Sequence, residues 1–300
     1  MSQWQKLGFL VRPSSQYWWM QSHGMIPTPE QLQGSLYKIY FSGRNDNNQS
    51  HIGWVLVDLN NPCEVLDISQ EPVLKPGRLG CFDDNGVSPS CVVKNGELTH
   101  LYYIGWNPGS TTRMNIFGGL AISKDGGKSF ERYSEAPIIE RCRANPFINT
   151  APFVLKESDS QWRMYFVAGV EWLHKDLPRY HIQVAHSANG FDWRREGQVA
   201  IDFIEGENAL ARPFVRKEQG LYRMWFASKG EAYRLQYAES NDGLHWKRKT
   251  ECLDICPDSQ GPDSEMMEYA AVVNHGEQEI MFYNGNNYGE EGILVATRAR

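Results

Sequence analysis

The chain has little of what marks nucleic-acid-binding or membrane proteins. Its 30 lysines and arginines are outnumbered by 36 aspartates and glutamates, the net charge is −6, and no basic run occurs. Phosphate backbones require a clustered basic excess, so nucleic acid is not the expected partner. No segment approaches the roughly 18 apolar residues of a membrane-spanning helix. The first residues lack the charged lead and apolar stretch of a secretory leader, so we expect a cytoplasmic protein without a membrane span.

The cysteines are also few and scattered. Six occur in 300 residues, without the dense spacing of a disulfide scaffold. Cys252 and Cys256 are the one close pair, and no second pair accompanies them at the spacing of a zinc site. We therefore expect free buried thiols. We also expect no metal in the catalytic machinery and no cofactor.

What the chain does have is an internal repeat, which returns five times at intervals of about sixty residues. Each unit contains a strand-leading residue, an apolar run, a turn and an aromatic-rich strand. The leading residues are Pro27, Pro89, Pro152, Pro213 and Ala271. The aromatic-rich strands are YKIYFSG (37–43), LYYIGW (101–106), WRMYFVAG (162–169), YRMWFAS (222–228) and EIMFYNG (279–285).

This repeat predicts the fold class. A single unit of this length cannot bury both of its faces, so several units of short strands must pack around a centre. We predict an all-β chain folded as a five-bladed β-propeller, with blades of about four antiparallel strands. The repeat uses the whole chain, which indicates a single domain over residues 1–300.

Three tight turns recur within the units. They are SKDGGKSF (123–130), SANGFDW (187–193) and SNDGLHW (240–246). Asp or Asn beside Gly supplies the positive-φ residues that a tight hairpin needs, so we expect each turn to link the third and fourth strands of a blade. The first turn resembles the Asp-box of sialidases, which is a structural motif. We therefore assign Asp125, Asn189 and Asp242 to turns.

The two ends of the chain depart from the pattern. The first unit lacks the turn, and the last unit stops at its third strand, LVATRAR (294–300). A strand from the other end must complete the last blade, and WQKLGFLVR (4–12) is the candidate. Such pairing closes the propeller with the N-terminal strand and removes a free sheet edge.

Strand direction places polar residues of all units on one face. If the first strand of each blade leaves this face, the antiparallel second strand returns to it. Residues before the first strand and after the second strand therefore converge in a funnel. Amides, arginine and tryptophan suit a carbohydrate, because tryptophan stacks on the sugar face and polar groups bind hydroxyls. The predicted substrate-binding residues are His23, Arg44, Trp106, Asn149, Arg212 and Asn286.

Carboxylates in the same funnel suggest glycosyl chemistry. Cleavage or transfer of a glycosyl unit needs two carboxyl groups beside the bond, one protonated and one ionised. The predicted catalytic residues are Asp84, Glu171, Glu268, Asp83 and Glu265, and Glu207 is a more solvated member of the pool. We favour Asp84 together with Glu171 or Glu268. The apolar neighbours of Glu268 would raise its pKa if the side chain is buried.

Several of these residues have a second interpretation. Asp83 and Asp84 lie in CFDDNGVSP (81–89) and could cap a turn. Arg212 precedes the leader of an innermost strand, where an unpaired charge is costly, so it must pair with a carboxylate or bind a ligand. His23 could be a core or turn histidine, or a ligand for substrate or metal. The sequence also leaves open a Ca²⁺ ion in the channel.

These segments carry a family resemblance. The repeat, the FDDNGVSP and ARPFV openings, the MWFAS strand and the Ser-x-Asp-Gly-x-x-Trp turn resemble the five-bladed β-propeller superfamily of glycoside hydrolase families 32, 43, 68 and 130. FDDNGVSP, LYYIGWN, GLAISKDGGKSFER, DSEMMEY and MFYNGNNYG also resemble bacterial propeller proteins of surface-polysaccharide gene clusters and the propeller part of plant glucosamine inositolphosphorylceramide transferases. Family 43 has an aspartate at the start of blade one, where this chain has His23, and the WMNDPNG, RDP and ECP motifs of family 32 are absent.

The resemblance implies a glycoside hydrolase-like enzyme, a glycosidase or transglycosidase acting on a bacterial glycan or activated sugar. Arg212 and Trp106 would position the sugar, and Arg212 with Arg44 would hold a phosphate or carboxylate in a sugar-phosphate or similar ligand. The alternative is a non-catalytic carbohydrate-binding propeller that assists a glycosyltransferase in polysaccharide biosynthesis. A sialidase-like enzyme is a weaker third interpretation, because sialidases use six blades and three converging arginines.

Overall fold

The computed structural model describes residues 3–300, which are nearly all β-structure. Twenty strands are accompanied by one 3₁₀ turn, η1 (Thr250–Cys252), and one short helix, α1 (Asn286–Gly289). The all-β class predicted from the repeat is confirmed. Within residues 3–300, no helix combines the length and the hydropathy required to cross a bilayer.

The strands form five units of four, and strands that are adjacent within a unit pair antiparallel. The first unit contains β2 (Ser22–Gln33), β3 (Leu36–Arg44), β4 (Ser50–Asp58) and β5 (Val65–Ile68). The second contains β6 (Gly86–Asn95), β7 (Leu98–Pro108), β8 (Met114–Ser123) and β9 (Glu131–Arg132). The third contains β10 (Asn149–Ser158), β11 (Gln161–His174), β12 (Leu177–Ser187) and β13 (Val199–Ile201). The fourth contains β14 (Ala209–Glu218), β15 (Leu221–Lys229), β16 (Tyr233–Ser240) and β17 (Lys247–Arg248).

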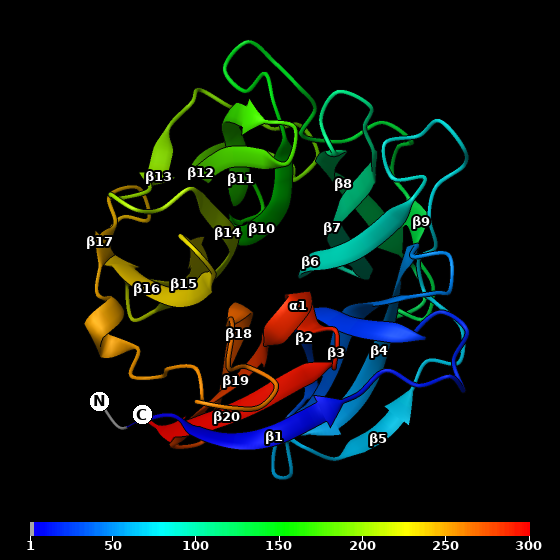
Figure 1. Ribbon diagram of the computed structural model, residues 1–300, viewed down its shortest axis with the longest axis vertical. Coiled ribbons are helices and arrows are strands. Elements are labelled where there is room, and N and C mark those ends of the chain that lie inside the picture. Colours follow the sequence, from blue (N-terminus) through cyan, green and yellow to red (C-terminus); the bar gives the residue numbers. More distant parts are fainter. Residues whose placement is uncertain (1–2) are drawn as a thin grey trace.

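The fifth unit combines strands from both ends of the chain. It contains β18 (Glu268–His275), β19 (Gln278–Asn284), β20 (Ile293–Ala299) and β1 (Gln5–Val11). Strand β1 pairs antiparallel with β20, from Gln5 opposite Thr297 to Val11 opposite Ile293. Strands from the two ends of the described chain, β1 and β20, lie side by side in consequence (Figure 1). The predicted pairing of residues 4–12 with the last unit is therefore confirmed.

The units are arranged around a common centre, and β2, β6, β10, β14 and β18 are the innermost strands (Figure 1). The largest hydrophobic cluster extends through several units and includes Tyr102, Phe166, Trp225 and Met281, none of which is more than 1% exposed. Each unit therefore buries its faces against its neighbours, which a single unit could not do alone.

The three recurring turns have the role that the sequence predicts. They link β8 to β9, β12 to β13 and β16 to β17. In the first of them the Asp125 Oδ1 atom accepts the backbone N–H groups of Lys128 at 3.0 Å and Ser129 at 3.1 Å. Hydrogen bonds from the hydroxyls of Ser123 and Ser129 hold the pKa of Asp125 far below its usual range. Asp125 therefore stabilises the turn, as Asn189 and Asp242 do in the equivalent turns.

Buried tyrosines dock two of these turns on the preceding unit. The Tyr102 hydroxyl, on β7, donates to the Gly190 carbonyl at 2.9 Å. The Tyr165 hydroxyl, on β11, donates to the Gly243 carbonyl at 2.9 Å. Both tyrosines are fully buried, so each hydroxyl satisfies a carbonyl of the neighbouring unit without competition from water.

Replacing Tyr165 by Phe removes this donor and leaves the Gly243 carbonyl without it. We expect the free energy of unfolding to fall by about 1–2 kcal/mol, the usual cost of an orphaned buried acceptor. Urea unfolding measures this change. Tyr133→Phe is the control, because Tyr133 is 51% exposed and should change stability by less than about 0.5 kcal/mol. A Tyr165→Phe protein as stable as wild type would show that the contact does not hold the units together.

All six cysteines are free, as the sequence predicts, but the prediction that they are buried holds only for Cys91, and Cys256 is exposed. Cys91 is fully buried on β6, and burial raises the pKa of its thiol to about 12. In the described part of the chain, no three His, Cys, Asp or Glu side chains are grouped so that they could hold a metal ion.

Candidate functional site

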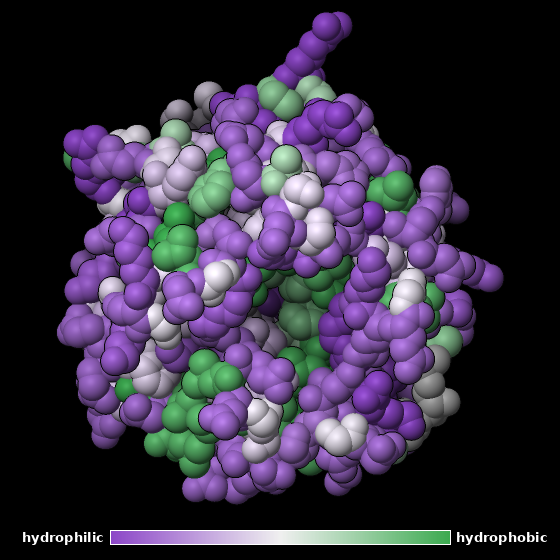
Figure 2. Space-filling view, turned by 180° about the vertical axis from the view of Figure 1, so that it is seen from behind, coloured by the Kyte–Doolittle hydropathy of each residue, from purple (hydrophilic) through white to green (hydrophobic). Residues whose placement is uncertain are grey.

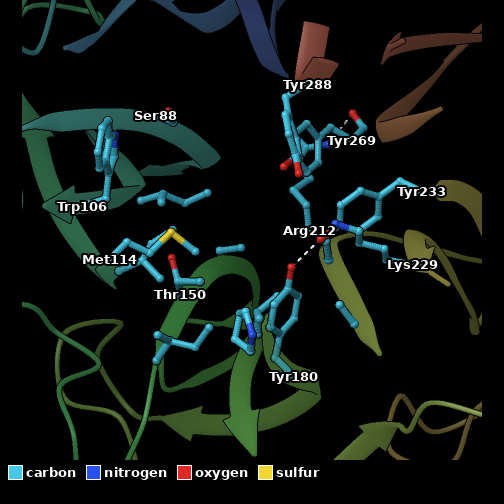
Figure 3. A pocket seen from close by; sticks show the side chains of 18 of the residues that line it. Ser88, Trp106, Met114, Thr150, Tyr180, Arg212, Lys229, Tyr233, Tyr269 and Tyr288 are labelled. Carbon is cyan, nitrogen blue, oxygen red and sulfur yellow. Dashed lines mark hydrogen bonds between the residues drawn. The ribbon is translucent and has the colours of Figure 1, made fainter. Parts of the chain in front are cut away.

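A cavity of about 260 Å³ lies where the innermost strands begin and the second strands end. All five units contribute to its lining, so it lies at their common centre (Figure 3). This is the face that strand direction predicts. The lining residues used below are Ile26, Arg44, Ser88, Trp106, Arg113, Met114, Ala151, Asp176, Tyr180, Arg212, Lys229, Tyr233, Tyr269 and Tyr288.

Backbone strain aims four of these residues into the pocket. Ile26, Ala151, Arg212 and Tyr269 have φ angles of 58°, 49°, 43° and 55°, in the left-handed region. Each lies on an innermost strand at a shift in the pairing register with the second strand. Such a conformation costs on the order of 1–3 kcal/mol per residue. Bulges re-aim side chains next to functional sites, and the repetition in four units marks this end of the molecule as the site.

Four tyrosines form one side of the pocket (Figure 3). The hydroxyls of Tyr180 and Tyr233 share a hydrogen bond, and Tyr288, from α1, meets the Tyr233 ring edge-on at 6.2 Å between centroids. Burial raises the pKa of Tyr180 to about 12 and raises those of Tyr233 and Tyr269 well above the usual range. These phenols therefore stay neutral at physiological pH and can exchange hydrogen bonds with a ligand.

Trp106 stands across the pocket from the tyrosines (Figure 3). Its indole Nε1 donates to the Ser50 Oγ atom at 2.9 Å, which fixes the ring. Met114 lies on the same side of the pocket. An apolar ring that is held in place opposite hydroxyl groups is suited to a sugar, because a sugar has one apolar face and polar edges.

Arg212 is 1% exposed and ties three units together. Its Nη1 atom donates to the Ala270 carbonyl at 2.8 Å and more weakly to the Tyr269 carbonyl at 3.4 Å. Its Nη2 atom donates to the Pro27 carbonyl at 2.7 Å and to the Thr28 hydroxyl at 3.1 Å. None of these partners is a carboxylate. The sequence predicted that Arg212 pairs with a carboxylate or binds a ligand, but most of its hydrogen bonds go to backbone carbonyls. Burial lowers the pKa of Arg212 to about 9, which leaves it charged at neutral pH.

Glu268 is fully buried at the start of β18. Burial raises its pKa well above the usual range, and the Tyr269 hydroxyl and the Lys229 charge oppose this shift only in part. Neither carboxyl oxygen has a hydrogen bond of normal geometry. The pKa increase expected from its apolar neighbours is therefore present, and burial favours the neutral form of Glu268, which directly precedes Tyr269 of the pocket lining.

Further cations surround the pocket. Arg44 is half-buried and donates to the Asn48 Oδ1 atom at 2.9 Å. Arg113 is exposed, and the Lys229 ammonium lies 5.5 Å from the centre of the Tyr233 ring. Burial, together with the Arg44 charge, lowers the pKa of the neighbouring His23 to about 4. His23 is therefore neutral at physiological pH.

Three predicted residues, Arg44, Trp106 and Arg212, line this pocket. Asp83 and Asp84 do not belong to its lining. The buried Asp83 carboxylate accepts from the Tyr103 hydroxyl and from the Arg132 Nε atom, both at 2.9 Å. Asp84 accepts the backbone N–H of Gly80 at 2.8 Å. The Asp84 contact corresponds to the turn-capping alternative that the sequence left open, whereas Asp83 bonds side chains of β7 and β9.

The other predicted carboxylates also have partners or lie in solvent. Glu171 pairs with Arg179 at 2.8 Å on the hairpin of β11 and β12. Glu207 pairs with Arg248, from the outermost strand of its own unit, at 2.8 Å. Glu265 has an exposed side chain. The structure therefore does not bring Asp84, Glu171 and Glu268 together in the pocket lining.

The predicted amides hold loops in place. Asn149 is fully buried, and its Nδ2 atom donates to the carbonyls of Glu140 at 3.1 Å and Asn145 at 3.0 Å. Asn286 Oδ1 accepts the backbone N–H of Glu265 at 2.8 Å. His23 bonds the adjacent Ser22 hydroxyl at 2.9 Å and has a left-handed φ of 64°. None of Asn149, Asn286 and His23 lines the pocket.

Sequence reasoning missed the tyrosines and Arg113. Tyr180 and Tyr233 begin the third strands of their units, or lie close to that point. A third strand leaves the same face to which the second strand returns, so its first residues form a third ring around the pocket. Strand direction therefore contained this information, but the prediction used only the residues before the first strand and after the second strand of each unit.

The opposite end of the centre is hollow as well, and hydrophobic residues are visible in it (Figure 2). A second cavity, of about 410 Å³, is lined there by Val92, Phe153 and other residues from the later halves of the innermost strands. Its charged residues are paired, Lys94 with Glu30 at 2.5 Å and Lys156 with Asp159 at 2.7 Å. It lacks the tyrosine and tryptophan walls of the first pocket, so it is the less suitable site for a sugar.

Comparisons with known proteins agree with this architecture. No protein-family model matches the chain. It is 40% identical over 298 residues to the uncharacterized protein Rv1502 of Mycobacterium tuberculosis, covering 98% of both chains. A stretch of 103 residues, 34% of this chain and 33% of the relative, is 28% identical to a β-1,2-mannobiose phosphorylase of Thermoanaerobacter sp..

Solved structures of glycoside hydrolases share the fold. The BT0996 RGII complex has a TM-score of 0.77 at 19% identity, over 98% of this protein and 91% of the other. A thermostable family-43 glycoside hydrolase has a TM-score of 0.70 at 14% identity, over 92% of this protein and 88% of the other. At these identities the likeness concerns the fold, and function must be argued from the site.

Proposed function

We propose that the central pocket of this chain binds a carbohydrate. The chain belongs to the family of the uncharacterized mycobacterial protein Rv1502, and its fold is that of the β-propeller superfamily of glycoside hydrolases. One observation carries this proposal. A fixed Trp106 ring faces four tyrosines across a cavity at the common centre of all five units. Stacking on the ring and hydrogen bonds to the phenols together match the apolar face and polar edges of a sugar.

The remaining architectural and cellular expectations belong to the same proposal. We infer that the five units are blades of one closed five-bladed propeller and that β1 supplies the outer strand of the fifth blade. We also infer a cytoplasmic protein of bacterial polysaccharide metabolism. If the pocket only binds its sugar, the protein would present it to a glycosyltransferase partner.

A second candidate function is cleavage or transfer of the bound glycosyl unit. It is favoured by Glu268, a carboxyl group that burial keeps protonated directly before a pocket tyrosine. A protonated carboxyl is the usual general acid of glycosidases. The second carboxylate is the weaker part of this candidate. Within residues 3–300 the one carboxylate that lines the pocket is Asp176, which is exposed.

Calorimetric titration with a panel of saccharides tests the binding proposal. Trp106→Ala should weaken binding about tenfold, about 1.4 kcal/mol, because it removes the stacking surface. Trp106→Phe keeps an aromatic ring and should retain much of the affinity. Trp18→Ala is the control, because Trp18 is 40% exposed and lies outside the pocket lining. Equal affinity of Trp106→Ala and wild type would exclude this pocket as the sugar site.

Turnover measured in the same samples separates the two candidates. Aryl glycosides and nucleotide sugars are the substrates, and wild type is compared with Glu268→Gln and Asp84→Asn. Loss of a general acid lowers the rate by about 10²–10⁴-fold, so enzymatic function requires such a loss in Glu268→Gln. If wild type binds a sugar but does not turn over any substrate, the enzymatic function is excluded and the binding function remains.

A further inference from the structure

The cationic side chains of the central pocket have no carboxylate partner. Arg44, Arg113, Arg212 and Lys229 line the pocket, and none of them forms an ion pair within residues 3–300. The guanidinium of Arg212 bonds backbone carbonyls and a hydroxyl, and that of Arg44 bonds an amide oxygen. Four positive charges are thus gathered around one small cavity.

This arrangement differs from the rest of the chain. The protein is acidic overall, with a net charge of −6, so carboxylates are plentiful. Many partly buried cations elsewhere have taken them, although the buried Lys38 bonds only the carbonyls of Gly126 and Gly127. Arg132 pairs with the buried Asp83 at 2.9 Å, and Lys94 of the opposite cavity pairs with the buried Glu30 at 2.5 Å. What distinguishes the pocket is therefore that four cations without an ion pair lie around one cavity.

Acidic groups near the pocket do not neutralise these cations. Asp176 is exposed at the turn between β11 and β12, where water screens its charge. Glu268 lies close enough to Lys229 for the two to interact, but burial favours its neutral form. Glu290 interacts with Arg44, but it is exposed and no ion pair joins the two, so the pocket lining keeps an excess of positive charge.

Two of the cations also have unused donors. The Nε atoms of Arg212 and Arg44 are buried and have no hydrogen-bond partner. Arg212 is 1% exposed, so its charge has lost nearly all of its hydration. A buried charge is costly unless an opposite charge or hydrogen bonds compensate for it. An anion in the pocket would supply the missing compensation.

We propose that the carbohydrate ligand of this pocket carries a negatively charged substituent, a phosphate or a carboxylate, held by Arg44, Arg113 and Lys229. The inference rests on the proposed binding of a carbohydrate. Arginine binds such a group through two parallel hydrogen bonds, and lysine binds it as a point charge. The sugar ring then lies between Trp106 and the tyrosines. A cavity of about 260 Å³ is near the lower end of small-molecule sites, which indicates a ligand of one or two sugar rings.

Titration of the full chain with matched probes tests this proposal. The probes are hexose 1-phosphates, hexose 6-phosphates, hexuronates, the corresponding neutral hexoses and inorganic phosphate. We expect one anionic sugar to bind at least about tenfold more tightly than its neutral counterpart, because each charge-assisted hydrogen bond contributes that much. The advantage should shrink as salt is added. Tighter binding of a hexose phosphate would identify the anionic group as a phosphate, and tighter binding of a hexuronate would identify it as a carboxylate.

Two variants locate the anion, with one control. Lys229→Met and Arg113→Met should each weaken binding of the anionic sugar about tenfold and leave the neutral sugar almost unchanged. Lys247→Met, on the exposed strand β17, also removes one positive charge and should change neither affinity. Unchanged melting temperatures show that the variants are folded.

The outcomes separate this inference from the proposed function. Equal binding of neutral and anionic sugars would overturn the inference and leave the carbohydrate site intact. Inorganic phosphate that binds as tightly as every sugar phosphate would overturn it too, because the sugar ring would then contribute nothing. A protein that binds none of the sugars would contradict the proposed function itself.

Discussion

Replacing Glu268 by glutamine is expected to stabilise the protein at neutral pH and to leave its stability at pH 4 almost unchanged. Glu268 is 0% exposed, neither carboxyl oxygen has a hydrogen bond of normal geometry, and burial raises its pKa well above the usual range. Glutamine has nearly the same shape and cannot ionise. The substitution therefore removes the proton linkage of this site and little else.

The sign of the effect follows from where the proton is held. Below the pKa of an exposed glutamate, about 4.3, folded and unfolded chains both carry the proton, so pH has no effect through this group. Above that value the unfolded chain releases the proton while the folded protein keeps it. Unfolding is favoured progressively as pH rises, by at most about 1.4 kcal/mol per pH unit, until the raised pKa of the folded state is reached.

Urea unfolding of wild type and Glu268→Gln between pH 4 and pH 8 measures this effect. The free energy of unfolding of the variant should nearly equal that of wild type at pH 4. The difference between them should then grow with pH in favour of the variant. Glu265→Gln is the control, because Glu265 is three residues away and exposed, and its difference from wild type should stay flat. A flat difference for Glu268→Gln as well would mean that Glu268 is ionised in the folded protein.

Replacing Arg212 by methionine should lower the free energy of unfolding by about 3 kcal/mol or more. The substitution removes four hydrogen bonds and leaves the carbonyls of Pro27 and Ala270 without this donor. Hydrogen bonds from a charged group contribute about 1.5–3 kcal/mol each. Their loss outweighs the relief of removing a buried charge, because methionine fills much of the space but offers no donor.

Urea unfolding with a graded control checks the role of Arg212. Thr28→Val removes a hydroxyl that accepts from Nη2 at 3.1 Å and donates to the Ile26 carbonyl at 3.1 Å, so it should cost about 1–2 kcal/mol. Arg212→Lys keeps the charge but cannot reach the carbonyls of two other units at once, and should fall between Arg212→Met and wild type. Arg212→Met within about 1 kcal/mol of wild type would show that the guanidinium is poised for a ligand and does not hold the units together.

Local rules made several elements predictable from the chain itself. The turn at Asp125 was predicted because its carboxylate bonds N–H groups only three and four residues away. The pairing of β1 with β20 was predicted because the last unit lacked a strand and only the other end of the chain could supply it. The predicted likeness to glycoside hydrolase propellers is confirmed at the level of the fold by the solved structures.

Local rules did not predict which charged side chains pair with one another. Asp83 and Arg132 are 49 residues apart in sequence, and no periodicity states that they meet. Glu171 lies at a strand end as expected, but the register of its hairpin places Arg179 beside it. Asp83 and Glu171 were both expected in the funnel, and both contacts depend on three-dimensional neighbours that spacing along the chain does not specify.

The sequence by itself thus determined the β class, the repeat, the turns and the end of the molecule at which polar residues converge. Spacing and strand direction suffice for these, because they depend on neighbours along the chain. Only the tertiary structure decided which side chains at that end face the pocket and which are used in packing. The left-handed φ angles at Ile26, Ala151 and Tyr269 lie at shifts in the pairing register between strands, and burial in the folded protein raises the pKa of Glu268. Those non-local contacts decide the charge of the pocket, and therefore the chemistry of the ligand it can bind.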